Sequence, residues 1–185
     1  MNKQLVATFV LLSALWGAGS VAIADDEDSL HHNSDRPVPK LFDANGKYVG
    51  NVVYFGEPEF GDPGVILNIH GALVYASIKR PLDSPTQLQW HGFGPSYSGP
   101  NCSGTVFVQY ARGPFRPAAI VRSGATATLY VASGTLQQMV TVQSTVTGPP
   151  ETCWSESSSY VIPAWTVEST FDLTQHYPEP LRVGF

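Results

Sequence analysis

The sequence predicts an all-β domain, a sandwich or a partly open barrel of about nine to eleven short antiparallel strands. Three observations lead to this prediction. Short runs of β-branched and aromatic residues recur along the chain, and glycine and proline stand where these runs end. No long window keeps the helical period of apolar residues with capping residues at its ends.

The first predicted strands form hairpins. Residues 43–46 read Asp-Ala-Asn-Gly, a strong turn signal, and precede residues 47–55, which are rich in valine and tyrosine. A second strand pair is predicted at residues 65–70 and 72–78, on either side of a tight turn at Gly71.

The remaining strands are shorter and follow the same signals. They are predicted at residues 86–91, 106–110, 118–122, 126–132, 139–146, 160–162 and 165–167. Residues 92–104 hold four glycines and two prolines and are predicted to be a loop. Residues 171–185 are predicted to be irregular, because Pro178 and Pro180 interrupt them.

Residues 1–24 have the pattern of a secretory signal peptide. Lys3 precedes an apolar run at residues 5–16, and Ala22 and Ala24 occupy the small-residue positions of a cleavage site. A membrane anchor is the alternative, but the apolar run is short for a span of about 20 residues. We therefore expect an exported protein, periplasmic or extracellular, with no transmembrane helix in the mature chain.

Charge separates the next segment from the domain. Residues 25–40 carry many acids and few apolar side chains, so we expect a flexible acidic arm before a single β domain at residues 41–185. The formal net charge of the whole chain is −5, and its basic residues are scattered. Because nucleic-acid binding needs a concentrated basic surface, nucleic acid is not expected as a partner.

The chain has two cysteines, Cys102 and Cys153. An even count in an exported chain predicts one disulfide. A metal pair or a catalytic thiol would need histidine or cysteine partners at characteristic spacing, and none stands nearby in the sequence.

Aromatic residues gather around the two cysteine segments. Exposed, these rings could stack on sugars or apolar ligands; buried, they would form a core around the disulfide. The candidates are Trp90, Phe93, Tyr97, Trp154, Tyr160 and Trp165.

Catalytic and metal patterns are incomplete. The apolar run ending in His70-Gly71 resembles the oxyanion-loop strand of α/β-hydrolases, but no Gly-x-Ser-x-Gly elbow accompanies it. His31 and His32 lie beside acids in the expected arm, where no fixed geometry selects a metal. Residues 43–46 match the opening of a calcium loop without its closing glutamate, which favours a turn. We therefore predict no catalytic residue, no metal and no cofactor.

The carboxyl end offers another alternative. Phe185, Val183, Leu181 and Tyr177 alternate as in the last strand of a small outer-membrane barrel, although the two nearby prolines oppose such a strand.

The order of turn and cysteine motifs resembles a loose group of uncharacterised exported bacterial β-rich proteins with one disulfide. The motifs are the Asp-Ala-Asn-Gly turn at residues 43–46, Asn-Cys-Ser-Gly at residues 101–104, the late Cys153, and Val-Ile-Pro-Ala at residues 161–164. The resemblance implies a secreted β domain and carries no functional residues.

Together these features favour a non-catalytic, secreted or envelope-associated β domain with a binding or structural role. A glycan or an envelope protein is the expected kind of partner. The alternatives are the small outer-membrane barrel and a secreted glycoside hydrolase that uses two loop carboxylates, which the sequence cannot pair.

Overall fold

The computed structural model describes residues 37–55, 61–84, 86–148 and 151–185. The predicted signal peptide and residues 25–36 of the predicted arm lie outside the described residues. The compact unit runs from Pro37 to Phe185. Within it, the Pro39 carbonyl accepts a hydrogen bond from the Val52 N–H at 2.8 Å, and the first strand begins at Lys40.

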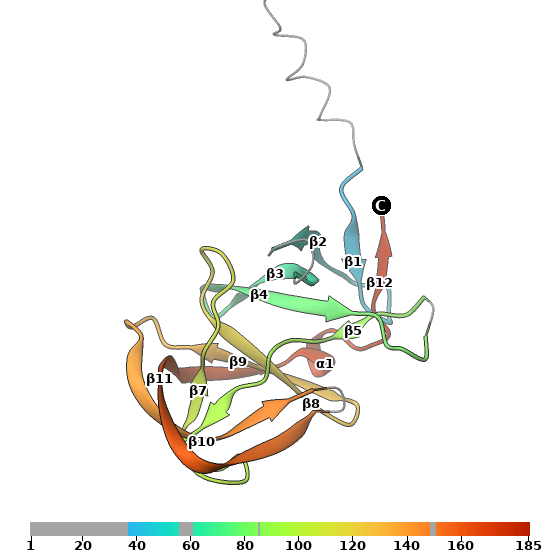
Figure 1. The fold of residues 1–185 in the computed structure, drawn as a ribbon. Coiled ribbons are helices and arrows are strands. Elements are labelled where there is room, and N and C mark those ends of the chain that lie inside the picture. Colours follow the sequence, from blue (N-terminus) through green and yellow to red (C-terminus); the bar gives the residue numbers. More distant parts are fainter. Residues whose placement is uncertain (1–36, 56–60, 85, 149–150) are drawn as a thin grey trace, which may run out of the picture. The chain divides into compact units, whose positions relative to one another are not determined.

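The unit is built from two curled antiparallel sheets of six strands each, which confirms the predicted fold class (Figure 1). In spatial order, the first sheet holds β12 (Arg182–Gly184), β1 (Lys40–Phe42), β2 (Tyr48–Tyr54), β3 (Pro63–Ile69), β4 (Ala72–Lys79) and β5 (Gln89–Trp90). The second sheet holds β10 (Gln138–Thr147), β6 (Ser96–Tyr97), β7 (Val106–Val108), β11 (Thr152–Asp172), β9 (Thr126–Ala132) and β8 (Ala118–Ser123).

Both sheets curl far enough to make additional pairings. Leu88 and Leu181 form an isolated antiparallel bridge, which joins the β5 end of the first sheet to its β12 end. In the second sheet, β10 pairs with β6 along one edge and with β11 along the other. The strands β10, β6, β7 and β11 therefore enclose a small core around Phe107, Val142 and Ala164.

The β3–β4 hairpin shows how the local sequence determines the turn. His70 and Gly71 both have positive φ, 50° and 89°, as the two central residues of a type I′ turn require. The Asn68 side chain accepts a hydrogen bond from the Gly71 N–H at 2.9 Å. His70-Gly71 is thus the turn of a hairpin, which accounts for the resemblance of this segment to a strand followed by a glycine loop.

The main core lies between the two sheets. Its buried residues come from the first sheet, as with Val65 and Trp90, and from the second, as with Ile120 and Leu129. Backbone hydrogen bonds also join the two halves: the Arg116 N–H donates to the Leu73 carbonyl at 2.8 Å. This junction fixes the start of β4 relative to the segment that leads into β8.

Two sequence-based predictions are wrong near the carboxyl end. Residues 160–162 and 165–167 belong to one strand, β11, because Pro163 adopts an extended backbone and its neighbours Ile162 and Ala164 stay paired with β10. Residues 171–185 are not irregular throughout. Asp172 caps the one-turn helix α1 (Leu173–His176), and β12 pairs with β1.

Candidate binding groove

Two clefts lie side by side where the sheets meet. The first, called here the polar cleft, has a volume of about 680 Å³ and is lined by Lys79, Arg80, Pro81, Leu82, Asp83, Gln89, His91, Arg122, Ser123, Gly124 and Glu151. The second, the aromatic cleft, has a volume of about 370 Å³ and is lined by His91, Gly92, Phe93, Gly94, Gln109, Tyr110, Thr145, Val146, Thr147, Gly148 and Glu151. His91 and Glu151 line both clefts, so we treat the two as one continuous groove.

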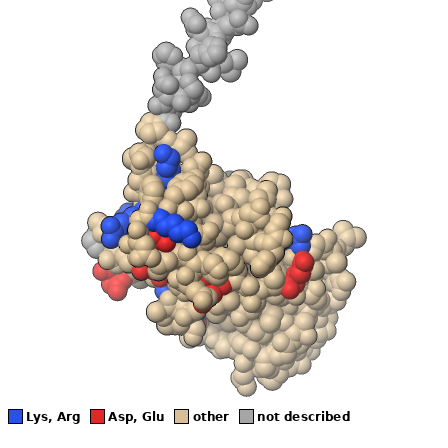
Figure 2. Space-filling view, turned by 180° about the vertical axis from the view of Figure 1, so that it is seen from behind, with Lys and Arg blue, Asp and Glu red and all other residues tan. Residues whose placement is uncertain are grey.

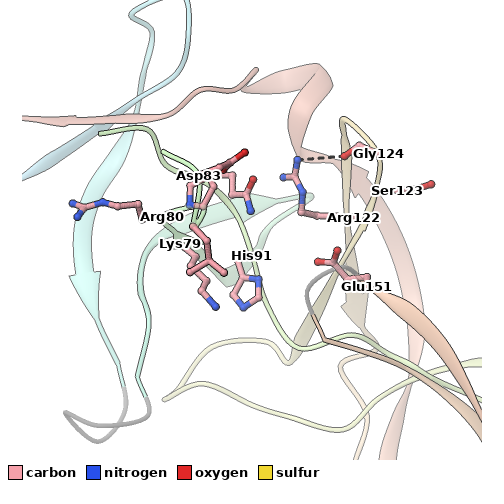
Figure 3. Close-up of a pocket in the computed structure, with 11 residues that line it drawn as sticks. Lys79, Arg80, Asp83, His91, Arg122, Ser123, Gly124 and Glu151 are labelled. Atoms are coloured by element: carbon pink, nitrogen blue, oxygen red, sulfur yellow. Dashed lines mark hydrogen bonds between the residues drawn. The ribbon is translucent and has the colours of Figure 1, made fainter. Parts of the chain in front are cut away.

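Opposite walls of the polar cleft come from different sheets (Figure 3). One wall is the end of β4 with the β4–β5 connection and β5, and it carries Lys79 and, just after β5, His91. The His91 N–H donates to the Ser77 carbonyl at 3.0 Å, which fixes the backbone at this point. The other wall carries Arg122 at the β8–β9 hairpin and Glu151 just before β11.

Several polar side chains in the polar cleft have no protein partner. Among the described residues, Lys79, His91 and Glu151 form no side-chain hydrogen bond and no ion pair. Arg122 differs, because its guanidinium holds the Glu179 carboxylate through Nη1–Oε1 at 2.7 Å and Nη2–Oε2 at 3.0 Å. The cleft therefore presents donors and an acceptor that remain available to a ligand.

His91 has an altered proton affinity. Burial lowers its pKa below the usual 6.5, and the nearby positive charge of Lys79 lowers it further. Figure 3 shows the two side chains next to each other on the same wall. His91 is therefore neutral at neutral pH and offers one ring N–H donor and one ring nitrogen acceptor.

Two exposed rings form one side of the aromatic cleft. Phe93 and Tyr110 each keep 51% of their surface exposed, and their ring centroids are 4.9 Å apart at an interplanar angle of 38°. The Arg112 guanidinium carbon lies 5.1 Å from the Phe93 ring centroid, which is within cation–π range. These contacts hold two apolar surfaces at the groove without burying them.

Of the predicted aromatic residues, only Phe93 lines the groove. Trp90 is fully buried in the main core, and its indole N–H donates to the Tyr177 carbonyl at 3.2 Å. Tyr97 is buried, and Tyr160 and Trp165 pack against the two smaller cores. Trp154 is 61% exposed but lines neither cleft.

Sequence reasoning did not single out Tyr110, Lys79, His91 or Glu151 for a common site. Tyr110 follows β7 and meets Phe93 only because the chain folds back between them. Glu151 follows a proline pair in the sequence and lies in the connection between β10 and β11. No local signal links these positions, since they lie on four separate segments.

Other predicted features have structural roles. Cys102 and Cys153 form the predicted disulfide. The Asp43 carboxylate is buried and accepts hydrogen bonds from the N–H groups of Asn45 and Lys47, both at 2.9 Å, as in a tight Asx turn. No cluster of three metal-ligating side chains occurs in the described part of the chain, and His31 and His32 lie outside it.

No protein-family model, no curated protein and no solved structure matches this chain. Within the residues that the structure describes, no helix is long and apolar enough to cross a membrane.

Proposed function

We propose that this chain is an exported, non-catalytic binding protein that holds a saccharide in the groove. The observation that carries the proposal is the combination of two exposed rings with unpartnered polar side chains in one continuous groove. A pyranose presents an apolar C–H face and a rim of hydroxyls, so it needs both kinds of contact.

The chemistry is divided along the groove. Phe93 and Tyr110 offer apolar surface against which a sugar ring stacks. Glu151 accepts hydrogen bonds from hydroxyls, and neutral His91 donates one and accepts one. The two cleft volumes, about 680 and 370 Å³, suit a ligand of more than one sugar unit.

The disulfide supports the exported location in this proposal. Disulfides persist in oxidising compartments and are rare in reducing ones, and both cysteines of the chain are paired. This agrees with the signal-peptide pattern in residues 1–24.

The test is binding of neutral hexose, amino-sugar and uronic-acid oligosaccharides, followed by titration calorimetry of those that bind. We expect Phe93→Ala and Tyr110→Ala each to weaken binding by about two- to tenfold, since one stacked ring contributes about 0.5–1.5 kcal/mol. Tyr48→Ala is the matched control, because Tyr48 is also half exposed and in edge contact with Phe42, but lies on β2 outside the groove. Binding that both groove variants retain in full, or no binding across the panel, rejects the proposal.

A second candidate, hydrolysis of the bound glycan, rests on one observation. Asp83 and Glu151 line the polar cleft from opposite walls, as a pair of glycosidase carboxylates would. Release of reducing ends that Glu151→Gln abolishes, while leaving binding within a fewfold of the unaltered protein, would favour this candidate. Binding without any release favours the binding protein.

A further inference from the structure

The outer face of the β10–β11 ribbon is apolar and lacks a partner. Met139 stands opposite Pro163 in the ladder, and Thr141 stands opposite Val161, so these side chains share one face. Val140 and Ile162, which stand between these two pairs, point to the inner face and pack against the small core of Phe107, Val142 and Ala164. The outer face is thus the side of the ribbon that covers nothing within the described unit.

The exposure of this face is high for apolar side chains. Leu136 is 88% exposed, Met139 68% and Val161 58%, and Pro163 is exposed as well. The Gln137 side chain donates to the Pro163 carbonyl at 3.3 Å and holds the Leu136 loop beside the ribbon. We call these four residues, Leu136, Met139, Val161 and Pro163, the apolar strip.

The segments that form the apolar strip carry no charged residue. Residues 123–150 contain no Lys, Arg, Asp or Glu, and neither do residues 157–167 of β11. Figure 2 shows the lower part of the molecule, over the second sheet, as almost free of charged side chains. The chain as a whole has a formal net charge of −5, so this face is where two copies approach with least repulsion.

The backbone beside the strip narrows the choice of partner. Before Ser144, β10 pairs only with β11, and no strand in the described part of the chain pairs with its other edge. A lipid surface cannot satisfy the N–H and C=O groups of a strand edge, whereas a second strand can. A charged protein partner would find no complementary charge here.

We propose that the apolar strip, with the adjacent free edge of β10, binds a second copy of this chain. The free β10 edges of the two copies pair across a two-fold axis in an isologous interface, which brings Met139 of one copy close to Met139 of the other on the outer face. The contact gives the β10 edge a partner strand and shields the apolar side chains next to that edge from water. The inference is independent of the proposed ligand, since no residue of the apolar strip lines the groove.

The test is the molar mass of the purified exported protein by sedimentation velocity and light scattering over a dilution series. We expect twice the monomer mass at high concentration and a reversible fall on dilution. Leu136→Glu and Met139→Glu should each raise the dissociation constant by about tenfold or more, because each places like charges across the two-fold axis.

Leu82→Glu is the matched control, because Leu82 is fully exposed on the β4–β5 connection, away from the strip, and its replacement should leave the dimer intact. Unchanged circular dichroism and a closed disulfide in each variant separate loss of association from loss of fold. A protein that stays monomeric at every concentration overturns the proposal. So does a dimer that both strip variants leave intact, or a monomer that instead binds phosphatidylcholine vesicles.

Discussion

His91 occupies the point where the two clefts meet, and its environment disfavours a positive charge. Burial of the ring is the largest cause of its lowered pKa, followed by the charge of Lys79. Asp62 and Glu151 act in the opposite direction, and Arg122 adds a small further lowering. The ring is thus kept uncharged at a position that lines both clefts.

This environment makes the stability of the fold depend on pH. Above pH 6.5, the usual pKa of histidine, His91 is neutral in the folded and unfolded states and adds no pH dependence. As the pH is lowered below this value, His91 takes up a proton in the unfolded chain before it does in the folded one. The free energy of unfolding therefore decreases as the pH is lowered, until the pH passes the lowered pKa of His91 in the folded state.

We expect His91→Gln to lose less stability than the unaltered protein between neutral and mildly acidic pH. Urea unfolding of both proteins at several pH values measures this. Parallel stability curves for the two proteins would contradict it.

At the scale of the element, the β8–β9 hairpin is tied to the first sheet by one ion pair. Arg122 of β8 holds Glu179, and the Glu179 carboxylate also accepts the Trp90 N–H of β5 at 2.6 Å. The two side chains are only 13% and 16% exposed. One carboxylate thus connects β8, β5 and the segment before β12.

The expected result is that Arg122→Ala lowers the free energy of unfolding by about 2–4 kcal/mol, because it leaves a largely buried carboxylate without its cation. Arg122→Lys should recover only part of this, since an ammonium cannot bind both carboxylate oxygens in the same geometry. Chemical denaturation measures both values.

Arg116→Ala is the control for this variant. Its 2.9 Å ion pair with Glu168 is more exposed, at 29% and 60%, and we expect a loss below about 1 kcal/mol. Equal losses in the two alanine variants would show that the Arg122 pair is an ordinary surface contact.

The same scale shows which elements the sequence could reveal. The β3–β4 hairpin was predictable, because two short apolar runs on either side of a glycine turn are local signals. The β1–β12 pairing was not, since its two strands lie at opposite ends of the described chain and β12 has only three residues. Sequence-based prediction divided β11 at Pro163, because the pairing that keeps the strand continuous is supplied by β10.

The groove was less predictable than the fold for the same reason. Phe93 could be singled out from composition near a cysteine segment, but its partner Tyr110 becomes visible only when the two rings meet at 4.9 Å. Trp90 carries the same kind of signal in sequence, yet it is fully buried. Composition identifies aromatic candidates, while burial, which depends on long-range packing, decides which of them reach solvent.

At the scale of the whole molecule, the disulfide links the β6–β7 connection to β11 within the second sheet. Cys102 lies in the β6–β7 connection and Cys153 near the start of β11. Polar contacts hold the same connection: the Cys102 N–H donates to Ser144 Oγ at 2.9 Å, and Ser144 Oγ donates to the Gly99 carbonyl at 2.6 Å. The bond therefore reinforces a loop that already contacts β10.

Removing the disulfide should act mainly through the unfolded chain. The bond spans 51 residues, and its loss frees a loop whose closure entropy corresponds to about 4 kcal/mol of stability in the chain-entropy model. We expect the double variant Cys102→Ser with Cys153→Ser to lose about this amount, while the native signals of the sheets persist below its lower melting temperature. Because β10 and β11 stay paired without the bond, the effect should be a uniform shift of one unfolding transition.

Thermal unfolding of the protein with and without reductant measures this shift. The double variant is the control, because reductant cannot alter it. An identical transition in oxidised and reduced protein would mean that the hydrogen bonds of Ser144 and the β10–β11 ladder already constrain this loop as strongly as the covalent bond does.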